Sequence, residues 1–284
     1  MLKRKSLGYS EAVLLLLMTL VATTSAAAVI QCKNERGNPI FTDNASLCHG
    51  NTATAVKLKE AANPDKEKIS FRIPQREYQK TSGRWSLYLE SSMVTGDPDL
   101  ADKAQRKLER NLSEIFAVLP AQTARKLERL SFYLMWGEDA PGGGRDSGMS
   151  FIRDGEPDNY PHLDPRWNGV IVIYSAKNLM YLDSLWTKKA LMHELAHAWH
   201  IMNWPEKYEP IYAAYVNAKS KDLYRNVKDY KGKTIPTAYA IKNQLEYFAE
   251  LSAIYFVGGN YFPYSKSDLK NYDSAGFEMV SLLW

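Results

Sequence analysis

Two histidines and a glutamate in one short stretch have the types and spacing of a metal centre with an adjacent base. His193 and His197 are four residues apart, and Glu194 directly follows the first of them. Side chains four residues apart lie on one face of an α-helix, about 5–6 Å apart at Cβ. Two imidazoles so placed can share one tetrahedral Zn²⁺, and the carboxylate of Glu194 can accept a proton from water there. The stretch therefore predicts one Zn²⁺ per chain and a general base.

The residues around this motif are mainly apolar, which predicts a buried helix over residues 186–203. Pro205 lies just beyond its expected end. The alternative interpretation is a core helix with two hydrogen-bonded histidines and a coincidental glutamate. The two interpretations differ in what they require elsewhere, because a catalytic zinc needs a third protein ligand and an open position for water.

Candidates for the third ligand lie in three places. His200 is on the same helix, but three histidines of one straight helix do not converge easily on one ion. Glu206 and Glu209 follow the first helix closely and would need a tight reversal of the chain. A second helix predicted over residues 239–250 has a polar stripe with apolar residues around it. The stripe consists of Tyr239, Asn243, Glu246 and Glu250. It is either a solvated face or, beside the first helix, the source of the remaining ligand.

The region before the motif helix has helix and strand patterns that indicate an α+β fold. Apolar residues recur every three or four positions over residues 99–118, which predicts an amphipathic helix ended by Pro120. Strand patterns follow at residues 127–136, 149–153 and 169–175, and residues 85–94 favour extended structure. The order is therefore helix, three strands and the motif helix. This order resembles the zincin architecture, which implies that the strand before the motif helix lines the active-site cleft and can bind a substrate peptide by strand addition.

At these motifs the chain resembles the gluzincin family of zinc metallopeptidases over residues 85–284. The shared motifs are His-Glu-Leu-Ala-His-Ala-Trp-His at 193–200, Ala-Tyr-Ala at 238–240 and Glu-Tyr-Phe-Ala-Glu at 246–250. They are similar to the catalytic domain of anthrax lethal factor and closer still to a set of secreted metallopeptidase-like proteins. The latter also share a tail like residues 260–264 and the pair Tyr272-Asp273.

The resemblance implies a zincin-like domain, with a twisted sheet, an active-site helix and a C-terminal helical part. It implies Glu246 as the third zinc ligand and Tyr239 as a group that stabilises the transition state. Glu250 would orient a ligand histidine through its other ring nitrogen. His200 either contacts the site or the substrate, or only packs within its helix.

These inferences predict a secreted zinc metallopeptidase that hydrolyses a peptide or protein substrate, with Glu194 as the general base. The alternative is a zinc-binding envelope protein without turnover. A purely structural zinc site needs four protein ligands, and only three are expected to converge here. No motif of the sequence indicates which peptide is cleaved.

The first 28 residues have the pattern of a secretory signal peptide. Lys3, Arg4 and Lys5 precede an apolar stretch, and small residues at 25–28 predict cleavage after Ala28. The alternative is an uncleaved membrane anchor, for which the apolar stretch is short and rich in threonine. We expect export to the periplasm or beyond, typical of a Gram-negative bacterium, and no stable membrane span after cleavage.

The cysteines Cys32 and Cys48 are the only two of the chain, and an exported pair predicts a disulfide. They lie in residues 29–50, where two strand patterns flank a turn cluster and predict a small β-hairpin module. It resembles short cysteine-containing modules of Gram-negative envelope proteins. Residues 51–84 are polar and predict a linker, and residues 85–284 form the main domain.

The composition is that of an ordinary globular protein, with 45% hydrophobic and 24% charged residues. The formal net charge is +4, and it falls to +2 when Lys3, Arg4, Lys5 and Glu11 are removed with the signal peptide. The remaining chain has no basic block, which argues against a nucleic-acid partner.

Overall fold

The computed structural model describes residues 30–33, 39–42, 54–55, 76–141, 143–160 and 162–284. The chain divides into two compact units, residues 1–68 and 69–284. The predicted signal peptide and the predicted Cys32–Cys48 disulfide lie outside what is described. Among the described residues, no helix has the length and apolar character needed to cross a membrane.

The first unit contains a small antiparallel sheet. Strand β1 (Ile30–Lys33) pairs with β2 (Pro39–Thr42), as the hairpin pattern predicts. A third strand, β3 (Thr54–Ala55), pairs with β1 on its other side. The sheet therefore extends past residue 50 into the segment predicted as a linker, because a short strand can pair across a long connection.

The second unit is built on a five-stranded mixed sheet with the order β4-β5-β6-β8-β7. The three central strands are parallel, and the two edge strands are antiparallel to their neighbours. The strands are β4 (Tyr78–Lys80), β5 (Ser86–Glu90), β6 (Ser131–Leu134), β7 (Met149–Ile152) and β8 (Val170–Ile173). Strand β4 lies in the predicted linker, so the expected domain start at residue 85 is too late.

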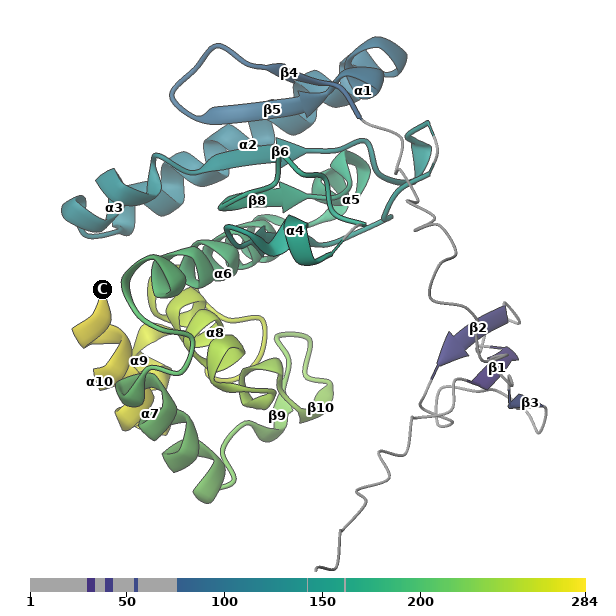
Figure 1. Ribbon diagram of the computed structural model, residues 1–284. Coiled ribbons are helices and arrows are strands. Elements are labelled where there is room, and N and C mark those ends of the chain that lie inside the picture. The colour runs from purple at the N-terminus through teal and green to yellow at the C-terminus, as the bar shows by residue number, and fades with distance from the viewer. Residues whose placement is uncertain (1–29, 34–38, 43–53, 56–75, 142, 161) are drawn as a thin grey trace, which may run out of the picture. The chain divides into compact units, whose positions relative to one another are not determined.

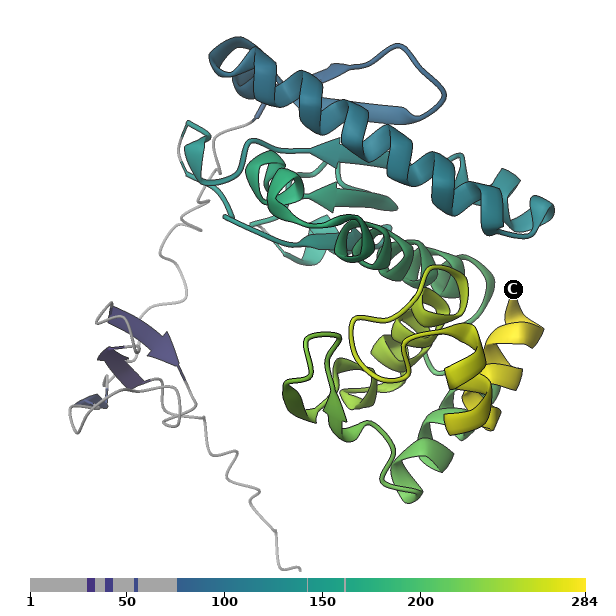
Figure 2. The ribbon, with the colours of Figure 1, turned by 180° about the vertical axis from the view of Figure 1, so that it is seen from behind.

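Helices cover one face of this sheet and form the C-terminal half of the unit. Helix α2 (Pro98–Val118) crosses the sheet (Figure 2), and its start is capped by Asp97, whose side chain accepts the N–H of Leu100. The helix predicted over residues 99–118 is thus confirmed. The other α-helices described before the motif helix are α1 (Ser91–Gly96), α3 (Ala121–Leu127), α4 (Glu156–Asn159) and α5 (Ala176–Tyr181).

The motif helix α6 (Ser184–Asn203) runs between the sheet and the C-terminal helices (Figure 1). It begins at the N-cap Asp183, whose side chain accepts the N–H of Trp186. After it come α7 (Glu209–Ser220), the hairpin β9 (Arg225–Lys228) and β10 (Thr234–Thr237), the 3-10 turn η3 (Tyr239–Ile241), α8 (Gln244–Phe256), α9 (Lys266–Tyr272) and α10 (Ser274–Leu283). Helix α6 therefore contacts both halves of the unit.

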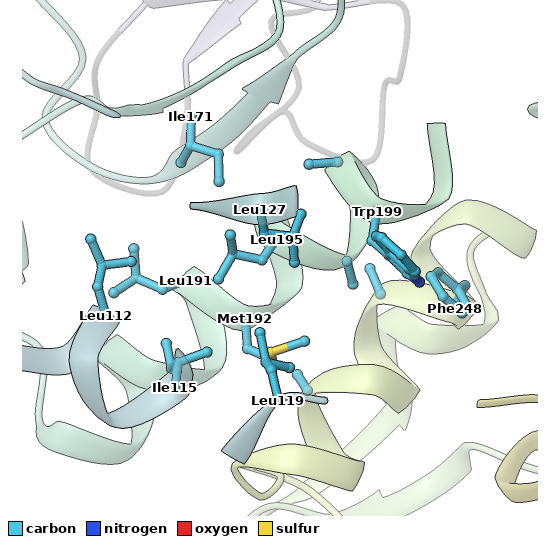
Figure 3. Close-up of a cluster of buried hydrophobic side chains, with 14 of the residues drawn as sticks. Leu112, Ile115, Leu119, Leu127, Ile171, Leu191, Met192, Leu195, Trp199 and Phe248 are labelled. Carbon is cyan, nitrogen blue, oxygen red and sulfur yellow. The ribbon is translucent and has the colours of Figure 1, made fainter. Parts of the chain in front are cut away.

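The main core lies where α2, the sheet and α6 meet (Figure 3). Its side chains come from one face of each helix, because apolar residues repeat with the helical period. The labelled members are Leu112, Ile115, Leu119, Leu127, Ile171, Leu191, Met192, Leu195, Trp199 and Phe248. A second cluster contains Tyr133 of β6 and Val172 of β8, with Trp167 from the segment before β8 packed with them. Both faces of the central strands are thus buried.

Replacing a buried leucine of α2 should test this core. Leu112 is fully buried, so Leu112→Ala should lower the free energy of unfolding by about 2–5 kcal/mol through lost burial and a cavity. Val118 on the same helix is half exposed, and Val118→Ala should change it by no more than about 0.5 kcal/mol. Urea titration of both variants measures the two values, and equal losses would contradict the packing described.

Candidate metal centre

Three side-chain atoms from α6 and α8 converge in one largely buried group. The Nε2 atoms of His193 and His197 are 3.0 Å apart, and Oε2 of Glu246 lies 3.1 Å from the first and 3.2 Å from the second. Tetrahedral zinc with bonds of about 2.0–2.1 Å needs ligand atoms about 3.3 Å apart. The donor set of two imidazoles and one carboxylate therefore fits a zinc ion in type and spacing.

The charges of this group shift the pKa values of its members. Burial lowers the pKa of His193, but hydrogen bonds with Glu246 and Glu250 more than offset this effect and raise it to about 10. Burial raises the pKa of Glu246, yet the two histidines hold it far below its usual range. His193 and Glu246 thus stabilise each other's charged forms.

Tyr239 lies before the start of α8, in a separate turn. Asn243 is the N-cap, and its side chain accepts the N–H groups of Leu245 and Glu246. The helix predicted over residues 239–250 is therefore wrong in its first part, because Asn243 is extended and Tyr239 lies in the separate turn η3. The hydroxyl of Tyr239 nevertheless donates to Oε1 of Glu246 at 2.9 Å.

A cation lies beside this phenol. Nζ of Lys242 donates to the hydroxyl of Tyr239 at 2.9 Å and to Oε1 of Glu246 at 3.3 Å. The hydrogen bond from Lys242 opposes the rise in the pKa of Tyr239 that burial causes. Sequence reasoning missed Lys242, although its position four residues before Glu246 is visible in the sequence.

Glu194 lies on the other side of the ligand histidines, against the edge strand β7. Its Oε2 accepts the backbone N–H of Phe151 at 2.7 Å. The strand that precedes α6 in the chain, β8, lies between β6 and β7 and is covered on both sides. The expectation that this strand lines the cleft is therefore wrong, and β7 takes that place because it adds antiparallel to the outer side of β8.

A cleft of about 700 Å³ contains the metal group and Glu194. Its lining includes β7 with the loop and short helix that follow it, and also Ile201, Tyr239 and Leu245. Glu206 also lines it and pairs with Arg153 at 2.7 Å, which places this ligand candidate in the wall and outside the metal group. Glu209 is the first residue of α7 and is not in the group either.

His200 is fully buried and lies outside both the metal group and the cleft lining. Its Nε2 donates to the carbonyl oxygen of Pro205 at 3.1 Å, and its ring packs edge-on against Phe248. Burial lowers the pKa of this imidazole. Its contacts are thus with the end of α6 and with α8.

Glu250 is buried behind His193, with its Oε1 2.8 Å from Nδ1 of that histidine. Lys189 and Tyr261 also donate to this carboxylate, and sequence reasoning missed both. Lys189 is a lysine on a mainly apolar helix, four residues before His193, and this signal was available. Tyr261 belongs to the tail motif at residues 260–264, whose role the sequence does not indicate.

Compared with family models, curated proteins and solved structures, the chain has no match. The interpretation of the site therefore rests on its residues and their geometry.

Variants of the candidate ligands should separate the third ligand from its neighbours. Glu246→Ala should lose tightly bound zinc, because it removes one of three ligand atoms. His200→Ala and Glu206→Ala should each keep about one zinc per chain. Zinc titration against a competing chelator measures all three. If His200→Ala empties the site while Glu246→Ala stays filled, the ligand set is wrong.

Proposed function

We propose that this protein is a zinc-dependent peptidase of the gluzincin type that hydrolyses peptide bonds. The observation that carries the proposal is the position of Glu194 in the same cleft as the group His193, His197 and Glu246. A base beside a three-ligand metal group is the arrangement that hydrolysis needs, because it leaves one coordination position for water. The predicted signal peptide adds export to the proposal, so the enzyme would act in the periplasm or outside the cell.

Each side chain of the site has a chemical role in this proposal. Zinc bound by the three residues would supply water of lowered pKa, about 7 in zinc enzymes of this kind. Glu194 accepts the proton of the attacking water and returns it to the leaving amine nitrogen. Its hydrogen bond from Phe151 holds the carboxylate at the edge of the cleft. The hydroxyl of Tyr239 donates to the developing oxyanion in place of Glu246.

The edge strand β7 supports a peptide as the substrate. Its residues Met149, Ser150 and Phe151 line the cleft beside Glu194. Among the described strands, none pairs with the outer side of β7. An extended peptide can therefore add to this edge through backbone hydrogen bonds, which recognise a peptide whatever its side chains are.

Replacing the proposed base tests the reaction. Glu194→Gln should retain one zinc per chain while peptide hydrolysis is lost, since an amide cannot accept the proton. Glu278→Gln, an exposed glutamate on α10, is the matched control and should keep full activity. Zinc content and cleavage of a peptide library are measured on the same preparations. A zinc-binding protein without turnover would show no cleavage by the wild-type protein either, and this result would reject the proposal.

Tyr239→Phe separates a role in the transition state from one in binding. Loss of one oxyanion donor typically lowers kcat by about 10²–10³-fold, so we expect this loss with unchanged zinc content and a similar KM. Tyr264→Phe, which lies outside the cleft described above, is the control. A raised KM with unchanged kcat would make Tyr239 a substrate-binding residue.

A further inference from the structure

Both oxygens of the Glu250 carboxylate are held by buried donors. Oε1 accepts from Nδ1 of His193 at 2.8 Å and from Nζ of Lys189 at 2.9 Å. Oε2 accepts from Nζ of Lys189 at 2.8 Å and from the hydroxyl of Tyr261. The exposed fractions are 2% for Glu250, 6% for Lys189 and 3% for Tyr261. The position of the carboxylate is thus set by these three side chains.

Lys189 is unusual because its ammonium group is buried on a mainly apolar helix. Lysine is rarely buried without a partner, and a buried ion pair is often no more stabilising than apolar residues of similar size. Stability alone therefore gives little reason for a lysine here. The adjacent Lys188 shows the ordinary arrangement, since it is partly exposed and pairs with Glu114 at 3.2 Å.

Lys189 instead has a position that suits control of His193. It lies four residues before the histidine, so both project from the same face of α6 towards α8. By holding Glu250 with two hydrogen bonds, it fixes the acceptor for Nδ1 of His193. With Nδ1 so engaged, Nε2 is left to face Glu246 and His197.

Tyr261 connects the same carboxylate to the turn that carries Tyr239. Its hydroxyl donates to Glu250 and accepts the backbone N–H of Ala240 at 3.3 Å. Ala240 is the middle residue of η3, directly after Tyr239, whose own hydroxyl donates to Glu246. A continuous set of contacts therefore runs from His193 through Glu250 and Tyr261 to η3 and back to Glu246.

We propose that Lys189 and Tyr261 are positioning residues of the metal centre. Lys189 holds Glu250 against His193, and Tyr261 fixes the turn of Tyr239 to the same carboxylate. The proposal rests on the metal site of the proposed function. It concerns the affinity for zinc, which is measured without any substrate.

The matched pair Lys189→Met and Lys188→Met tests the first half. Removal of a group that orients a metal ligand typically weakens binding by about 10–100-fold, so Lys189→Met should show this loss and Lys188→Met none. Zinc affinity is measured against a competing chelator, at a temperature where circular dichroism shows the zinc-free variants folded. A lower melting temperature with wild-type zinc affinity means a purely structural role and overturns the proposal. A wild-type protein that binds no zinc rejects the proposed function itself.

Tyr261→Phe tests the second half and decides the matter if Lys189→Met does not fold. It removes one hydroxyl and keeps the ring and the Lys189–Glu250 ion pair. Zinc affinity should fall by about tenfold, at the lower end of the same range. Tyr255→Phe, whose hydroxyl contacts Ser281 of α10, should bind zinc as the wild type does. Equal affinities of the two variants would overturn the role of Tyr261.

Discussion

The candidate site depends on the way in which α6 and α8 meet. Polar side chains alternate across their interface in the order Lys189, Glu250, His193, Glu246 and His197. Each carboxylate lies between two basic groups, so both oxygens of Glu246 and both of Glu250 have partners. Loss of one member leaves another buried without its partner, and that costs more than a single hydrogen bond contributes. The contacts that keep the helices in register are thus the ones that bring the ligand atoms together.

This polar interface needs an apolar frame, because hydrogen bonds of the observed length tolerate little movement. The opposite face of α6 supplies it, with Leu191 and Leu195 packed in the main core. Near the C-terminal end of α6, the ring of Trp284 stacks on Trp199 of α6 and on Phe248 of α8. The last residue of the chain therefore joins the two helices that carry the site. The contacts of Trp284 with both helices thus help to hold His197 and Glu246 at their observed spacing.

Local sequence patterns predicted the helices and spacings that neighbouring residues determine. They failed where contacts with residues far along the chain determine the structure. The apolar period of α2 and the His193–His197 spacing are local, and both were readable. The start of α8 was not, since Asn243 fits the polar stripe of a helix as well as it fits an N-cap. The place of β7 at the edge depends on the order of the strands in the sheet. The burial of Lys189 depends on Glu250, its partner about 60 residues further along the chain. The resemblance to gluzincins stays a prediction.

The environment of Glu194 differs from that of the two glutamates on α8, although it adjoins a ligand histidine. Successive residues of a helix point about 100° apart, so Glu194 faces β7 while His193 faces α8. Glu246 and Glu250 each contact several basic or hydroxyl groups, whereas the described donor to Glu194 is a single backbone N–H. A carboxylate held at one oxygen keeps the other for a water molecule. This difference supports the proposed roles of Glu246 as a ligand, Glu250 as a positioning residue and Glu194 as the base.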